Sequence, residues 1–453
     1  MGSAGPTLPQ VSQNELQAMA YTDQLTGLGN RYRLRDKVRL LASERAADPA
    51  PFTVGIVNLD GFKPINDLFG SVAGDEILCQ VAHRLKACVP DGATVTRHDG
   101  DEFAIILPLV FERLGAERTG QMIKDVLSAP YDLGDRNVRL SASLGFAVYP
   151  FAGADFEELM KSAETALYRS KRRGRGQITV YSREIAQEMK RATQLEQALR
   201  HAIITDNVDV HFQPIVSLAD NRVVGFEALA RWNDPDLGFV SPAIFVPLAE
   251  ERGFIDMLSE TLLRKAAEAT LAWPHELFLS FNLSSAQLMD PRTTFNTLSI
   301  LSEVGFDPRR LELEITETAV MTSADTARRI LGELRDAGIR ISLDDFGTGQ
   351  SSLGRLRDFT FDKVKIDRAF VSAITTDRTS EHIIKAIVTM CEGLDLEVVA
   401  EGIETASEAE KLRRLGCGMG QGYYFGKPAD AAATLRYLDD HHHEFALVER
   451  AIA

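Results

Sequence analysis

The second half of the chain repeats one pattern, in which a short apolar segment that predicts a strand is followed by an amphipathic segment that predicts a helix. The predicted strands cover residues 211–216, 223–229, 277–283, 311–315, 340–343, 363–366 and 397–400. Seven or eight such units within roughly 250 residues match the size of a (β/α)₈ barrel. The repeat constrains the fold strongly, because such a barrel gathers the carboxyl ends of its strands at one mouth.

The first half alternates strand and helix patterns of its own, which predicts a separate α/β domain. Strands are expected at 52–59, 94–96, 103–107 and 138–148, and helices at 74–89 and 156–173. The dipeptide Asp99-Gly100 favours a hairpin turn between two of these strands. Residues 182–200 are polar and contain neither glycine nor proline, so we expect a helical linker there. At 453 residues the chain is long enough for two or three domains.

Composition excludes several classes of protein. The formal net charge of −15 at pH 7 argues against non-specific binding of nucleic acid, which depends mainly on a basic surface. No segment approaches the length of about eighteen apolar residues that a membrane span needs, and no secretory leader opens the sequence. The four cysteines lack metal-ligand spacing, which is typical of reduced thiols. We therefore expect a cytoplasmic protein, with residues 1–15 forming a tag or the stub of another region.

Polar and acidic residues stand at or just after the ends of the predicted strands in the second half. They are Gln213, Glu227, Arg231, Asn282, Glu314, Glu317, Asp344, Asp345, Lys365, Glu401, Glu404 and Gln421. Taken singly, such residues are usually solvated rim positions, ion-pair partners or turns. Their recurrence in successive units instead predicts one site, because strand ends converge in a barrel. Crowded carboxylates need cations, and oxygen ligands without Cys or His select hard ions such as Mg²⁺ or Mn²⁺.

The motifs around these residues resemble those of the EAL phosphodiesterase domain. Glu227-Ala228-Leu229 is the EAL motif itself. The other matching motifs, in chain order, are Phe212-Gln-Pro-Ile-Val216, Asn282-Leu-Ser284, Glu314-Ile-Thr-Glu317, Asp344-Asp-Phe-Gly-Thr-Gly349, Lys365-Ile-Asp367, Ala400-Glu-Gly-Ile-Glu404 and Gln421-Gly-Tyr423. So many ordered motifs make the resemblance specific, and it implies an EAL domain with a TIM-like (β/α)₈ barrel at residues 192–445.

This resemblance implies a role for each matching residue. Two Mg²⁺ or Mn²⁺ ions would be held by Glu227, Asn282, Glu314, Asp344 and Asp345. The attacking water would be positioned and activated by Lys365 and Glu401, and Glu317 would fix the loop that follows Asp344. The residues that contact the substrate or support the site would be Gln213, Arg231, Glu404 and Gln421. The implied reaction is hydrolysis of cyclic di-GMP to linear pGpG by a chain that forms homodimers.

The first half resembles a GGDEF domain, a nucleotidyl-cyclase-like α/β sandwich, from residue 16 to residue 181. The matching stretches are Asp23-Gln-Leu-Thr-Gly-Leu-Gly-Asn-Arg31, Asn58-Leu-Asp-Gly-Phe-Lys-Pro-Ile-Asn-Asp67, Gly74-Asp75, Asp99-Gly-Asp-Glu-Phe103 and Ala166-Leu-Tyr-Arg-Ser-Lys171. Such domains condense GTP or bind it as a regulator. The resemblance implies guanine contacts from Asn66 and Asp75, phosphate contacts from Lys171 and Arg175, and metal ligands from Asp101 and Glu102.

Two departures from the family pattern argue against cyclase activity in the first half. Asn58 stands where the family has a metal-binding Asp, and an amide lacks the charge that offsets Mg²⁺. Asp99 stands where the family has a glycine that lets the backbone approach the nucleotide. Residues 90–93 also lack the family's inhibitory motif. We therefore expect a degenerate domain that binds GTP and regulates its neighbour; a bifunctional cyclase and phosphodiesterase, or a non-catalytic cyclic di-GMP receptor, are the alternatives.

Overall fold

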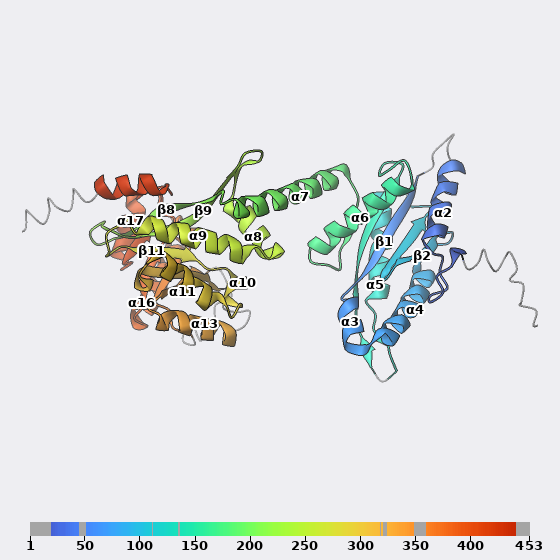
Figure 1. Ribbon diagram of the computed structural model, residues 1–453, viewed down its shortest axis with the longest axis horizontal. Helices are drawn as coiled ribbons and strands as arrows, with labels where there is room; N and C mark the ends of the chain where they lie inside the picture. Colours follow the sequence, from blue (N-terminus) through green and yellow to red (C-terminus); the bar gives the residue numbers. More distant parts are fainter. Residues whose placement is uncertain are drawn as a thin grey trace, which may run out of the picture. The chain divides into compact units, whose positions relative to one another are not determined.

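The computed structural model describes residues 20–440 except 45–50, 111, 135, 318, 320–323 and 348–358. The chain forms two compact units, with the boundary between Thr193 and Gln194 (Figure 1). The expected tail at residues 1–15 lies outside the described residues. Within the described part, no helix is both long and apolar enough to cross a membrane.

The first unit is a five-stranded sheet in the order β2-β3-β1-β6-β7. Its strands are β1 (Phe52–Asp60), β2 (Thr94–Asp99), β3 (Glu102–Leu107), β6 (Ser141–Tyr149) and β7 (Ile178–Val180). The central strand β1 pairs antiparallel with both β3 and β6, and its first eight residues are buried, as the apolar sequence predicts. A two-stranded ribbon, β4 (Tyr131–Asp132) and β5 (Asn137–Val138), stands apart, so the strand expected at 138–148 is divided.

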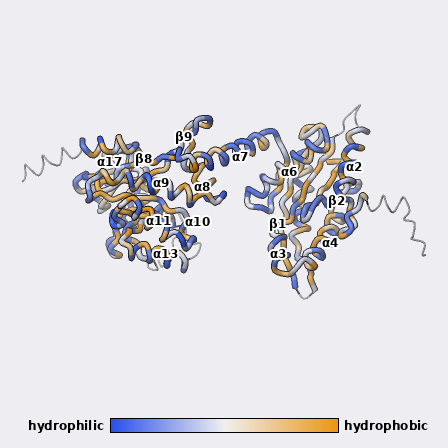
Figure 2. The backbone as a smooth tube through the Cα atoms, viewed as in Figure 1, coloured by the Kyte–Doolittle hydropathy of each residue, from blue (hydrophilic) through white to orange (hydrophobic). Residues whose placement is uncertain are grey.

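Helices cover both faces of this sheet, and Figure 2 shows the strands between them as mostly hydrophobic. One face packs against α2 (Arg31–Glu44) and α6 (Phe156–Arg172). The other face packs against α3 (Phe62–Phe69), α4 (Ser71–Cys88) and α5 (Arg113–Leu127). The unit is therefore a three-layer α/β sandwich, the fold that the resemblance to GGDEF domains implies.

The second unit is a closed barrel of eight strands, which confirms the predicted fold. The barrel strands are β8 (Val208–Ser217), β9 (Val223–Asp234), β11 (Phe278–Asn282), β12 (Leu311–Thr316), β13 (Arg340–Phe346), β14 (Lys363–Ile366), β15 (Glu397–Ala400) and β16 (Met419–Gln421). A short strand, β10 (Gly238–Val240), extends β9 as a hairpin. One detail differs from the expected repeat: β8 joins β9 through a turn, without a helix, and is antiparallel to both of its neighbours.

Helices surround the barrel (Figure 1). They are α8 (Pro242–Arg252), α9 (Ile255–Thr270), α10 (Ser285–Leu288), α11 (Thr293–Val304), the 3₁₀ turn η1 (Pro308–Arg310), α13 (Ala324–Asp336), α15 (Arg368–Val371), α16 (Arg378–Gly393) and α17 (Ala406–Arg414). Before the barrel, α7 (Arg183–Ile204) forms a continuous helix over the polar stretch. Its last turns pack on the second unit, where Glu196 pairs with Arg252 at 2.9 Å.

The barrel interior contains a buried ion pair at the amino-terminal end of its strands. Lys363, the first residue of β14, lies with its Nζ 2.6 Å from Glu312 Oε2, and both side chains are almost completely inaccessible. The Phe278 ring lies 4.0 Å from the same ammonium, so an aromatic face adds to its stabilisation.

Candidate active site

Lys365 is the centre of the polar site at the carboxyl end of the barrel strands. Its side chain is 1% exposed, and its Nζ lies 2.6 Å from Glu401 Oε1 and 2.7 Å from Glu314 Oε1. Glu227 and Asp344 approach the same ammonium at 3.6 and 3.9 Å. Four carboxylates from four strands therefore surround one cation, as converging strand ends predict.

Amide side chains hold Glu227 in place. Asn282 Nδ2 donates to Glu227 Oε1 at 2.8 Å, and Gln421 Nε2 donates to Oε2 at 2.6 Å. Gln421 also donates to Gln213 Oε1 at 3.1 Å, which connects the first and last strands of the barrel. Three of the predicted amide residues thus form one network around the EAL-motif carboxylate.

A residue that the sequence analysis did not single out holds Glu314. The Ser280 hydroxyl donates to Glu314 Oε1 at 2.6 Å. Ser280 precedes Asn282 by two residues on β11, so both side chains point into the barrel. That alternation was the available signal, but a serine inside an apolar strand does not stand out.

The balance of charge in the site shifts several pKa values. Burial favours the neutral form of Lys365, but the surrounding carboxylates outweigh it and hold the pKa of Lys365 well above its usual value. Burial and the neighbouring Glu227 carboxylate raise the pKa of Glu314 well above its usual range. Burial, only partly offset by Lys365, raises the pKa of Glu401 to about 7. One ammonium therefore does not neutralise the four carboxylates.

A cavity of about 250 Å³ opens beside this cluster. It is lined by Gln213, Glu227, Asp344, Arg368, Glu401, Gly402, Glu404, Gln421, Gly422 and Tyr423. The predicted residue Glu404 pairs with Arg368 at 2.7 Å on the cavity wall, where both side chains are well exposed. Arg368 and Tyr423 were not among the predicted site residues. An exposed cation and an exposed aromatic ring beside a carboxylate cluster can contact a phosphate and a base.

The remaining predicted residues lie at the edge of the site. Arg231, on β9, donates to the Ala230 carbonyl at 2.8 Å, and burial lowers the pKa of its guanidinium. Asp345 follows Asp344 with a left-handed φ of 56°, and burial together with the Asp344 charge raises its pKa. Glu317 begins the segment after β12, and its Oε2 is buried without a hydrogen-bond partner in the part of the chain that the structure describes. The segment it was expected to fix begins at Asp344-Asp-Phe-Gly347, which the structure describes, and its continuation at 348–358 lies outside the described residues.

The donor set fits a hard divalent cation by its chemistry. Its members are oxygen donors, and Glu314 Oε2 is buried without a hydrogen-bond partner among the described residues. Burying several carboxylates with a single ammonium leaves an excess of negative charge that a cation would offset. Within the described ranges, however, no three His, Cys, Asp or Glu side chains surround a common point closely enough to hold an ion. Lys365 occupies the centre instead.

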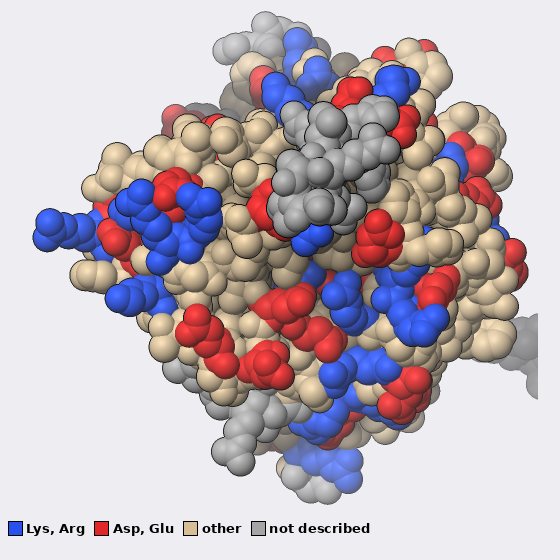
Figure 3. All heavy atoms as spheres, turned by 90° about the vertical axis from the view of Figure 1, so that its left-hand side faces the viewer, with Lys and Arg blue, Asp and Glu red and all other residues tan. Residues whose placement is uncertain are grey.

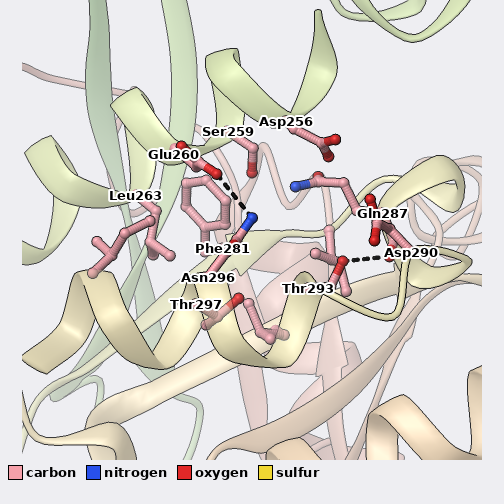
Figure 4. A pocket seen from close by; sticks show the side chains of 13 residues that line it. Asp256, Ser259, Glu260, Leu263, Phe281, Gln287, Asp290, Thr293, Asn296 and Thr297 are labelled. Atoms are coloured by element: carbon pink, nitrogen blue, oxygen red, sulfur yellow. Dashed lines mark hydrogen bonds between the residues drawn. The ribbon is translucent and has the colours of Figure 1, made fainter. Parts of the chain in front are cut away.

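Two other hollows occur in the second unit. An apolar one of about 510 Å³ adjoins the site and is lined by residues of β9, α8, α9 and β11, among them Leu229 and Asn282. The pocket in Figure 4 is much smaller, about 20 Å³, which suffices for one water molecule. There Asn296 donates to Glu260 at 3.0 Å across α9 and α11, so its polar groups serve helix packing. On the face that Figure 3 shows, acidic and basic side chains gather in neighbouring groups.

The first unit contains a second group of predicted residues. Asn66, on α3, has a buried Oδ1 without a hydrogen-bond partner among the described residues. A Cβ atom at position 74 would lie 1.9 Å from this oxygen, so Gly74 is required beside it. Asp75 follows on α4 and is exposed. The exposed Asp75 carboxylate is an acceptor open to a ligand with N–H donors, and Asn66 lies against the adjacent Gly74.

Comparison with known proteins agrees with this division. Residues 196–428 match the EAL domain family, and residues 20–177 match the family described as diguanylate cyclase, GGDEF domain. The chain therefore belongs to the family of proteins that carry a GGDEF domain followed by an EAL domain.

Several relatives are similar over nearly the whole chain. MucR of Pseudomonas aeruginosa, a bifunctional diguanylate cyclase/cyclic di-GMP phosphodiesterase, is 35% identical over 94% of this chain and 62% of its own length. NbdA of the same organism, a cyclic di-GMP phosphodiesterase, is 36% identical over 93% and 54%. PdeR of Escherichia coli, also a cyclic di-GMP phosphodiesterase, is 33% identical over 94% and 64%. The chain thus spans between half and two thirds of these relatives.

Two solved structures resemble parts of this chain. The MucR phosphodiesterase in complex with cyclic di-GMP has 36% sequence identity and a TM-score of 0.51, over 53% of this chain and 99% of that one. The EAL enzyme Bd1971, bound to cAMP and cyclic di-GMP, has 28% identity and a TM-score of 0.53, over 66% and 82%.

Proposed function

We propose that the second unit is a cyclic di-GMP phosphodiesterase that produces linear pGpG. The observation that carries the proposal is the convergence of Glu227, Glu314, Asp344 and Glu401 on Lys365 beside an open cavity. The chain has every strand-end carboxylate that the EAL motifs contain. Relatives named as cyclic di-GMP phosphodiesterases, and a phosphodiesterase solved with this nucleotide, support the choice of substrate.

Each side chain has a distinct task in this proposal. Glu401 takes the proton of the attacking water, and Lys365, 2.6 Å away, fixes the orientation of its carboxylate. Gln213 and Gln421 support Glu227 from the first and last strands. Arg368, on the cavity wall, is placed to contact a phosphate of the substrate.

Divalent metal binding is part of the proposal. Glu227, Asn282, Glu314, Asp344 and Asp345 would hold Mg²⁺ or Mn²⁺. The bound ions would supply Lewis acidity at the scissile phosphate and lower the pKa of the water. The adjoining apolar hollow beside Leu229 has room for a base of the substrate.

A chromatographic assay of cyclic di-GMP cleavage tests the proposal. We expect Glu401→Ala to reduce pGpG formation by about 10²- to 10⁴-fold, because a positioned general base is lost. Glu397→Ala is the matched control, since Glu397 begins β15 at the opposite end of the barrel, whereas Glu401 directly follows that strand. Equal losses in the two variants, or none in either, would contradict the assignment.

We further propose that the first unit binds GTP and regulates the second. The unpaired Asn66 Oδ1 beside the exposed Asp75 favours this candidate. Calorimetric titration of the full chain with GTP tests it. Binding should be lost in Asp75→Ala, and the rate of cyclic di-GMP cleavage should respond to GTP only when Asp75 is present.

A further inference from the structure

The end of β1 in the first unit is organised differently from a metal site. Asn58 is 7% exposed, and its Nδ2 donates to Glu102 Oε1 at 3.2 Å across the β1–β3 pair. An ionised carboxylate only accepts hydrogen bonds, so it orients the amide with the NH₂ group toward Glu102. Asn58 on β1 and Glu102 on β3 are therefore bonded to each other.

Asp60, the next carboxylate on β1, accepts hydrogen bonds at both of its oxygens. Asp60 accepts from the Ser141 hydroxyl at 2.7 Å, the Ser143 hydroxyl at 2.9 Å and the Gly176 amide at 2.9 Å. These donors hold Asp60 within the protein, and they fix the turn that carries Arg175. A divalent ion held by Asn58, Asp60 and Glu102 would have to displace these hydrogen bonds, so these three side chains do not fit one as they are arranged.

Cations are available nearby to take the place of a metal. Lys171 acts electrostatically on Glu102, which places its ammonium near the end of β3. Arg173 and Arg175 follow directly after α6 and are exposed. Three cations beside one turn suit the polyanionic tail of a nucleoside triphosphate.

We propose that the first unit binds GTP without a divalent metal ion, and that Asn58 is the residue responsible. This inference rests on the proposed binding of GTP. An aspartate at position 58 would place a second carboxylate against Glu102, and two adjacent carboxylates need a cation between them. The asparagine replaces that repulsion with a hydrogen bond, so the phosphates are neutralised by the cationic side chains at the end of α6 and directly after it.

The test is calorimetric titration of the full chain with GTP, in EDTA and in millimolar Mg²⁺. For the wild-type protein we expect the Kd in Mg²⁺ to be no tighter than in EDTA, within about twofold. For Asn58→Asp we expect weaker binding in EDTA and a tightening of about tenfold on addition of Mg²⁺. Asn58→Ala is the matched control: it frees Glu102 without adding a carboxylate and should not gain the Mg²⁺ dependence.

The possible results distinguish the inference that the site is metal-free from the proposal, on which it rests, that the first unit binds GTP. Wild-type binding that requires Mg²⁺ would overturn the metal-free site and leave GTP binding intact. No binding of GTP in either buffer would overturn both. Circular dichroism shows whether each variant is folded, and the wild-type comparison decides the question even if Asn58→Asp does not fold.

Discussion

Replacing Lys363 with methionine would show how much the buried ion pair in the barrel contributes to stability. Lys363 and Glu312 are 0% and 1% exposed, and no water reaches them to replace a lost partner. Removing one member of a buried pair costs about 3–5 kcal/mol, because the other charge is left uncompensated. Arg340 at 3.9 Å and the Ser280 hydroxyl at 3.4 Å still face Glu312, so we expect about 3 kcal/mol, the lower end of this range.

The double variant Lys363→Met/Glu312→Leu separates pairing from packing. With both charges gone, an apolar pair fills the space, and we expect a free energy of unfolding within about 1 kcal/mol of the wild type. Urea unfolding followed by tryptophan fluorescence measures this, because Trp232 and Trp273 are both buried in the second unit and report on it alone. A double variant as unstable as the single one would refute the reasoning.

Two further predictions concern other side chains. Ser280→Ala removes the hydroxyl that holds Glu314, and we expect the Mg²⁺ concentration needed for half-maximal pGpG formation to rise by about 10- to 100-fold; no change would exclude a positioning role. Burial raises the pKa of Cys391 to about 11 and of Cys417 to about 12, so their thiolates are scarce at pH 8. A disulfide reagent should modify exposed Cys79 at once and these two thiols only after unfolding, and rapid modification of all three would show that the second unit opens readily.

The barrel and its site were predictable because one rule of geometry connects them. Apolar strands recur with acidic residues at their ends, and closure of the barrel brings Glu227, Glu314, Asp344 and Glu401 together without further information. The arrangement of the individual side chains within this cluster was not predictable. Nothing in the sequence indicates that Lys365 takes the centre of the cluster.

Other features were missed for physical reasons. Lys363 and Glu312 have the composition of surface residues, and only the three-dimensional pairing explains their burial. The three residues of β16 are too few to show any periodicity. The reversed direction of β8 has no periodic signature either, because an apolar strand has the same sequence pattern in both directions.

That reversal decides where the chain enters the barrel. In a wholly parallel barrel the first strand would begin at the closed, amino-terminal end, far from the chemistry. Here Val208, the first residue of β8, pairs with Trp232, beyond Glu227 toward the carboxyl end of β9. Helix α7 therefore leads directly to the end of the barrel that holds the carboxylate cluster. Strand β8 then continues from there to Gln213 inside the site. A displacement of α7 would thus act first on the end of the barrel that holds the carboxylate cluster.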